Sequence, residues 1–77
     1  MTAEYLGRIV KQQRRKARMN QTELGMVSGT GRRFISELEN GKVSCQIGKA
    51  MEVLASLGIE MTLQTRNGEE LSDGQVS

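Results

Sequence analysis

The feature of this 77-residue sequence that most limits its possible folds is the segment NQTELGMVSGTGRRFISELENGK, residues 20–42. Asn20 is followed three residues later by Glu23, which is the spacing of a capping box. This pattern predicts that a helix begins at Gln21. The glycine that follows Ser28 favours a helix end near that residue, because glycine readily takes a positive φ.

A second short helix is predicted in the same segment. Ile35 and Leu38 lie three residues apart and indicate its buried side, and Asn40 with Gly41 indicates its end. Two helices of this size joined by a turn that contains glycine form a helix-turn-helix. In that arrangement the second helix can enter the major groove of DNA.

The polar side of this second helix is the candidate base-contacting surface, and it carries Arg32, Arg33, Ser36 and Glu37. An arginine can make a bidentate contact to guanine O6 and N7, worth about 1–3 kcal/mol of discrimination, and a glutamate can accept from cytosine N4. We therefore predict that these four residues contact bases. The alternative for the two arginines is solvation with non-specific attraction to phosphate, and the sequence leaves open which arginine contacts a base.

The loop after this helix, formed by Asn40, Gly41 and Lys42, is a candidate phosphate contact, because its backbone N–H groups and the Lys42 side chain could meet phosphates. An Asn-Gly helix end needs the same residues for purely structural reasons.

Phe34 and Gly25 are expected to have structural roles. Phe34 is expected to pack against the first or the fourth helix rather than against a thymine methyl group. Gly25, which costs about 1 kcal/mol relative to alanine in a helix, indicates close contact between the second and third helices.

The residues before this segment, Ala3 to Met19, predict a first helix with Thr2 as its cap. Its expected apolar face consists of Leu6, Ile9, Val10, Gln13 and Ala17. The rest of the helix is basic, and it carries Arg8, Lys11, Arg15, Lys16 and Arg18. A solvated surface is the alternative to a polyanion contact for most of these cations, and we predict a phosphate contact for Arg15.

A fourth helix is predicted from Ser44, a possible cap, to about Leu57, with Gly58 as its stop. Its expected buried stripe consists of Ile47, Met51, Leu54 and Leu57, widened by Ala50 and Val53. The single cysteine, Cys45, is expected to be a small buried hydrophobe rather than a redox or metal group.

The segment after this helix, Ile59 to Thr65, alternates apolar and polar residues and predicts a strand with one buried face. A lone strand leaves its backbone groups unpaired, and the sequence predicts no second strand. We therefore predict that Ile59, Met61 and Leu63 pair with the same strand of a second copy on a two-fold axis. The alternative is a β-hairpin with a different protein.

The charge distribution separates the two parts of the chain. Residues 1–49 hold ten Lys and Arg against four Asp and Glu, a balance of +6, and residues 50–77 hold one against five, a balance of −4. The sum is the net +2, and the polyanion contact is expected in the first part. We predict one domain, residues 1–65, followed by a flexible acidic tail, residues 66–77.

The composition argues against catalysis. Histidine is absent, the one cysteine has no nearby base, and the carboxylates are scattered. No metal-ligand spacing is present, so neither an enzyme nor a metal or cofactor is predicted. The sequence has no apolar run long enough to span a bilayer and no signal-peptide pattern, so a soluble cytoplasmic protein without membrane contact is expected.

The pattern N-Q-T-E-L-G, then G, then I-S-x-L-E-N-G-K resembles the lambda-repressor-like (xenobiotic-response-element) DNA-binding family over roughly residues 4 to 65. The resemblance implies a mainly α fold: a four-helix helix-turn-helix domain followed by one C-terminal β-strand that pairs across a dimer. It also implies a phosphate contact by Gln21, and a structural ion pair between Arg14 and Glu39.

More narrowly, GRRFISELENGK followed by LASLGIEMTL resembles the HipB-like antitoxins of that family. This resemblance implies a repressor of its own toxin-antitoxin operon that binds a HipA-like kinase toxin. The residues themselves support a homodimer on palindromic operator DNA, with two recognition helices in successive major grooves about 34–36 Å apart. The alternatives are a free-standing phage-type or chromosomal repressor without a toxin, and a protein-interaction module that has lost DNA binding.

Overall fold

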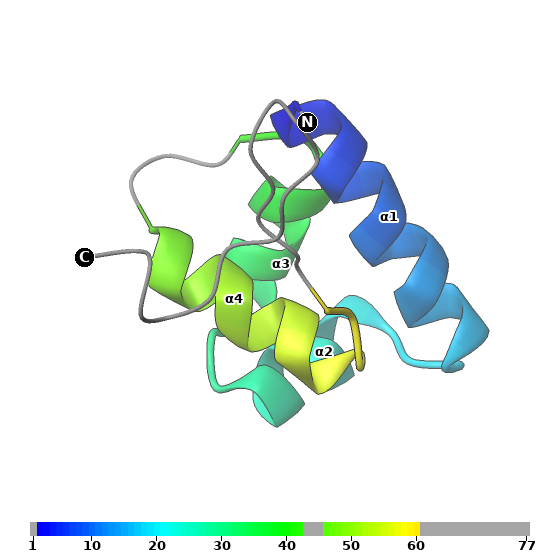
Figure 1. The fold of residues 1–77 in the computed structure, drawn as a ribbon. Coiled ribbons are helices and arrows are strands. Elements are labelled where there is room, and N and C mark those ends of the chain that lie inside the picture. The colour runs from blue at the N-terminus through cyan, green and yellow to red at the C-terminus, as the bar shows by residue number, and fades with distance from the viewer. Residues whose placement is uncertain (1, 43–45, 61–77) are drawn as a thin grey trace, which may run out of the picture.

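Four helices lie in the residues that the computed structural model describes, 2–42 and 46–60. They are α1 (Ala3–Lys16), α2 (Gln21–Ser28), α3 (Arg32–Glu39) and α4 (Ile47–Ser56). Figure 1 shows α1 and α4 on opposite sides of the molecule, with α3 between them in this view. Helix α3 packs against α1 and α2, and α2 packs against α4. The predicted mainly helical fold is confirmed over these residues.

In the described part of the chain, the core is one cluster to which α1, α2, α3 and α4 all contribute. Its buried apolar members are Val10, Leu24, Ile35, Leu38, Ala50, Val53 and Leu54. Five partly buried residues pack around it: Leu6, Met19, Phe34, Leu57 and Ile59. Because the shared cluster draws on all four helices, the orientation of α3 depends on the whole domain.

Helix α1 begins as predicted but ends earlier. The backbone N–H of Tyr5 donates to Thr2 Oγ1 at 3.1 Å, so Thr2 caps the helix. The helix ends at Lys16, three residues before the predicted end at Met19, because Arg18 takes a positive φ of 57°. Ala17 is exposed and does not belong to the apolar face.

Helix α2 confirms the capping box. Asn20 Oδ1 accepts from the backbone N–H of Glu23 at 2.7 Å, and Glu23 Oε1 accepts from the backbone N–H of Asn20 at 2.9 Å. Leu24 is fully buried, but Val27 is 63% exposed. Gly25 and Ser28 take the remaining buried positions of this helix.

Two glycines allow helices to approach closely. A Cβ atom on Gly25 would lie 2.5 Å from the carbonyl carbon of Gly31 and 2.6 Å from the backbone nitrogen of Arg32. This confirms the predicted close contact between α2 and α3. Gly7, for which the sequence analysis made no prediction, lies in an equally close contact: a Cβ added there would lie 2.5 Å from the Leu38 carbonyl oxygen. Helix α1 therefore rests directly on the backbone of α3.

Helix α4 differs from its prediction on the exposed side. It begins at Ile47 with Gln46 in the cap position, while the expected cap Ser44 lies outside the described residues, as does Cys45. Ile47 is 69% exposed and Met51 is 53% exposed, so neither belongs to the buried stripe. The buried positions instead follow the spacing i, i+3, i+4 and i+7: Ala50, Val53, Leu54 and the half-buried Leu57.

The end of α4 is the predicted one. Gly58 has a φ of 71°, its N–H donates to the Ala55 carbonyl, and the N–H of Ile59 donates to the Leu54 carbonyl at 2.9 Å. These two bonds are those of a Schellman motif. Ile59 is half-buried against the core of its own chain. The rest of the predicted strand, with Met61 and Leu63, and the tail of residues 66–77 lie outside the described residues.

Candidate nucleic-acid interface

The exposed side of α3 brings the four predicted base-contacting residues together. Arg32, Arg33, Ser36 and Glu37 occupy positions i, i+1, i+4 and i+5, which lie on adjacent parts of one helix surface. Both arginines are exposed, whereas Ser36 and Glu37 are half-buried. Gly31, with a φ of 97°, occupies the N-cap position and supplies no side chain, so the arginines stand at an open helix end.

One of these arginines is already oriented by a neighbour on its own helix. Arg33 Nε donates to Glu37 Oε1 at 3.2 Å, and the two side chains are 93% and 46% exposed. Such an exposed pair contributes about 1 kcal/mol or less to stability. Its geometric effect is to occupy one oxygen of Glu37, while the Nη groups of Arg33 make no hydrogen bond to the residues that the structure describes.

A nearly buried ion pair fixes α3 against α1, and it is the predicted pair of Arg14 and Glu39. Arg14 Nε donates to Glu39 Oε2 at 2.6 Å, and Nη2 donates to Oε1 at 3.0 Å. The side chains are 10% and 4% exposed. Hydrogen bonding to Glu39 raises the pKa of Arg14, against the opposing effect of burial.

The Glu39 carboxylate also forms a hydrogen bond with the start of α2. Gln21 Nε2 donates to Glu39 Oε1 at 3.2 Å, and Arg14 Nη1 donates to the Met19 carbonyl at 2.9 Å. The amide of Gln21 has a second N–H that this bond does not use. A phosphate contact by Gln21 stays a prediction, and the structure adds that Gln21 contacts α3 directly.

The backbone donors of the turn after α3 form hydrogen bonds within the protein. The N–H groups of Asn40, Gly41 and Lys42 all donate to carbonyls of α3, and the bonds from Gly41 and Lys42 form a second Schellman motif. The Asn40 side chain also donates, through Nδ2, to the Ser36 carbonyl at 2.9 Å. The idea that these backbone groups meet phosphate is therefore wrong, and the exposed Lys42 side chain is the candidate that remains strongest.

A hollow beside the exposed side of α3 contains residues that the sequence did not single out. It is lined by Thr30, Arg33, Phe34, Glu37, Gln46 and Lys49. Lys49 Nζ lies 5.8 Å from the centre of the Phe34 ring, within the range of a cation–π interaction. Phe34 is half-buried and packs on the core, and its neighbour Lys49 belongs to α4, in agreement with the predicted packing against the first or the fourth helix. The basic character of residues 1–49 was the available signal for Lys49.

Other kinds of site find no support in residues 2–42 and 46–60. No three side chains of the His, Cys, Asp and Glu types gather there in a way that would hold a metal ion. No helix of that part is both long enough and apolar enough to cross a membrane.

Comparison with known proteins matches residues 10–64 to a family described as helix-turn-helix. An uncharacterized HTH-type transcriptional regulator, y4mF, from Sinorhizobium fredii (strain NBRC 101917 / NGR234) is 41% identical over 62 residues, which are 80% of this chain and 82% of the relative. The restriction-modification controller protein C.AhdI from Aeromonas hydrophila has a similar crystal structure, with a TM-score of 0.67 at 21% identity. That likeness covers 75% of this chain and 84% of the controller protein.

Proposed function

Because the chain belongs to the helix-turn-helix family, we propose that it is a transcriptional regulator that binds double-stranded DNA through α3. The observation that carries the proposal is the pair of exposed arginines at the open start of α3, on a helix held by the buried Arg14–Glu39 pair. The name of the Sinorhizobium relative agrees with it. A gel shift with the upstream region of the protein's own gene tests it, and absence of any salt-sensitive shift would favour a protein-interaction module.

In the proposed complex α3 lies in the major groove and presents its first turn to base edges. Arg32 or Arg33 donates to guanine, while Ser36 and Glu37 face the next bases. The side chains of Gln21, Asn40, Lys42 and Arg15 contact phosphates and set the position of the helix on the duplex. The buried ion pair keeps α1, α2 and α3 in one arrangement, so the phosphate contacts and base contacts keep their relative distances.

Arg32→Ala and Arg33→Ala are expected to reduce discrimination among operator variants, by about 1–3 kcal/mol for the arginine that contacts guanine. Fluorescence anisotropy with a set of single-base operator variants measures it. Lys42→Ala, at an exposed position after the end of α3, is the matched control, expected to weaken all sequences similarly and to lower the salt dependence. Unchanged specificity in both arginine variants would reject α3 as the recognition helix.

We propose that the regulator acts as a homodimer on a palindromic operator. The support is the alternating pattern that follows Ile59, in which the apolar row of Met61 and Leu63 needs a partner strand, and the small core of a single copy, on which Ile59 itself packs. Met61→Lys places a charge in that row and is expected to weaken the dimer by about tenfold or more, because burial of a Met side chain contributes about 1.5–3 kcal/mol. Sedimentation equilibrium measures the dissociation constant, and an undiminished affinity would contradict pairing through this segment.

We also propose that the regulator is the antitoxin of a HipA-like kinase toxin and represses their shared operon. The support is the likeness of GRRFISELENGK and LASLGIEMTL to HipB-like proteins. Co-purification of a kinase with the tagged protein, and a kinase gene next to its own, are the expected results. A regulator that purifies alone and has no neighbouring kinase gene would instead be a free-standing repressor.

A further inference from the structure

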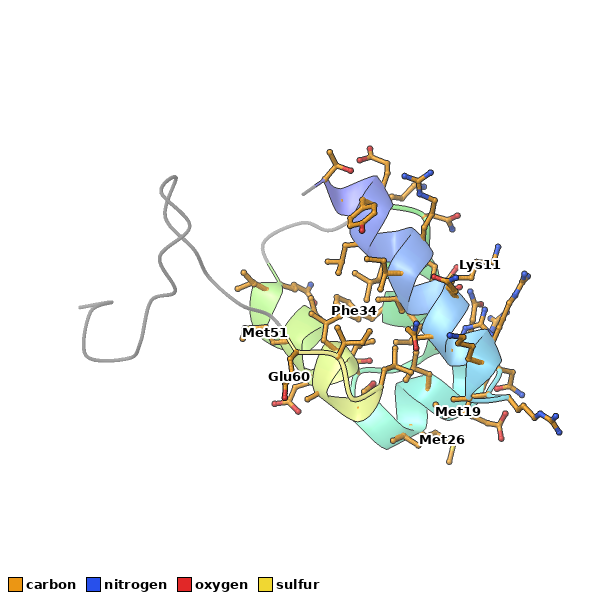
Figure 2. All side chains as sticks on the ribbon, turned by 45° about the vertical axis from the view of Figure 1, so that its right-hand side comes forward. Lys11, Met19, Met26, Phe34, Met51 and Glu60 are labelled. Atoms are coloured by element: carbon orange, nitrogen blue, oxygen red, sulfur yellow. The ribbon has the colours of Figure 1, made fainter. Side chains whose placement is uncertain are left out.

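Four basic residues form a stripe on the solvent side of α1: Arg8, Lys11, Arg15 and Lys16. They recur at i, i+3, i+7 and i+8, so they share one helix face, and together with Gln12 they line a shallow hollow. All four are exposed, and none forms an ion pair with another described residue. Figure 2 shows Lys11 on the side of α1 that faces away from α4. Of these four residues, only Arg15 is among the proposed phosphate contacts.

The ends of α1 lie beside the two elements that are proposed to contact phosphate. Near its start, Glu4 lies against the turn that carries Lys42, since a Cβ on Gly41 would be 3.1 Å from Glu4 Cγ. Near its end, Arg14 donates to the Met19 carbonyl, two residues before Gln21. Glu4 and Arg14 are ten residues apart, which corresponds to about 15 Å along the axis of α1. The basic stripe therefore runs along a helix that connects one proposed phosphate contact with the other.

We propose that the basic stripe of α1 is a second, sequence-independent binding surface for the phosphate backbone of the duplex that α3 engages. The proposal rests on the DNA-binding function proposed above and extends it. Four cations without a carboxylate partner among the described residues attract a polyanion. Long, flexible Lys and Arg side chains can contact backbone phosphates, and such contacts carry no sequence information. An acidic protein would satisfy the same charge, but the connection of α1 to both phosphate-contacting elements favours DNA.

The test is the double variant Arg8→Gln/Lys11→Gln in the full chain. Its affinity for the operator and for a scrambled duplex is measured by fluorescence anisotropy from about 0.05 to 0.3 M salt. On both duplexes the slope of log affinity against log salt is expected to fall by about 0.9 for each phosphate that the variant no longer binds. This corresponds to about fivefold weaker binding per phosphate at 0.15 M salt, with the preference for the operator unchanged.

A charge-compensated variant distinguishes the loss of a local phosphate contact from the effect of a lower net charge. Adding Glu52→Gln/Glu70→Gln, at an exposed position of α4 and in the acidic segment 66–77, restores the charge that the double variant removes, and the slope is expected to stay low. A salt slope that recovers in the charge-compensated variant overturns the proposal. A slope that does not fall in the double variant also overturns it, and would indicate that the basic stripe binds an acidic protein or is only solvated. Circular dichroism verifies folding, and Lys11→Gln alone should give about half the effect. A wild-type protein that binds no duplex would refute the DNA-binding function itself.

Discussion

Replacing Glu39 with alanine is expected to lower the free energy of unfolding by about 3–5 kcal/mol. The Glu39 carboxylate accepts two hydrogen bonds from Arg14 and one from Gln21, and its side chain is only 4% exposed. Without it, the nearly buried guanidinium of Arg14 keeps only the Met19 carbonyl as a partner among the described residues. A charge left unpaired in the interior costs far more than the intact pair contributes.

Urea denaturation followed by circular dichroism measures this loss, and the thermal midpoint is expected to fall by more than about 10 °C. Glu37→Ala is the matched control, because it removes the same side chain from the same helix but breaks an exposed pair, at a cost of about 1 kcal/mol or less. Equal, small losses in the two variants would show that the Arg14–Glu39 pair is not sealed from water. A double variant, Arg14→Met/Glu39→Leu, should regain much of the stability because no charge is left unpaired.

The pH dependence of the pair follows from the direction of the Arg14 shift. The Glu39 hydrogen bond raises the pKa of Arg14 in the folded protein above the ordinary arginine value. A group whose pKa is raised by folding contributes stability that is fully present below its unfolded pKa and is lost only as the pH rises through the folded value. The contribution of the Arg14 charge is therefore constant through the neutral and moderately alkaline range.

Local sequence signals predicted the parts of the fold that depend on few residues. The capping box of Asn20 and Glu23 needs only the two side chains and the first turn of a helix, so its spacing was sufficient. The glycine stops after α3 and α4 likewise depend on a positive φ at Gly41 and Gly58. The pairing of Arg14 with Glu39, 25 residues apart, came from family resemblance, since no local pattern links the two positions.

Features that depend on neighbouring elements escaped prediction. Ile47 and Met51 continue the apolar spacing of α4, but no other described element covers them, and spacing alone cannot show where a helix lacks a neighbour. The early end of α1 reflects the Arg14 bond to the Met19 carbonyl and the positive φ of Arg18. Both depend on how the turn between α1 and α2 folds back.

The candidate interface was predicted as a set of residues rather than as an arrangement. The sequence placed Arg33 and Glu37 on one side of α3, and their i,i+4 spacing already allowed an ion pair, which the prediction did not use. It assigned phosphate binding to backbone groups after α3, which instead complete the helix end. Lys49 belongs to a different helix, so its position over Phe34 could be found only from the packing of α3 and α4.

Gly7→Ala is expected to destabilise the protein by about 1–3 kcal/mol, the usual cost of overpacking. The added Cβ would lie 2.5 Å from the Leu38 carbonyl oxygen and 2.7 Å from that of Glu39. These are backbone atoms, and the Leu38 carbonyl already accepts from the Gly41 N–H, so neither can move independently of α3. Helix α1 must therefore shift away from α3, which also lengthens the Arg14–Glu39 hydrogen bonds.

Gly48→Ala is the matched control, because Gly48 lies in α4 and a Cβ there meets no atom within 4 Å. Alanine is favoured over glycine in a helix by about 0.5–1 kcal/mol, so this variant is expected to stabilise the protein. The same substitution should thus change the urea midpoint in opposite directions at the two positions. If Gly7→Ala also raises the midpoint, α1 has room to move off α3, and the close backbone contact does not determine where the recognition helix lies.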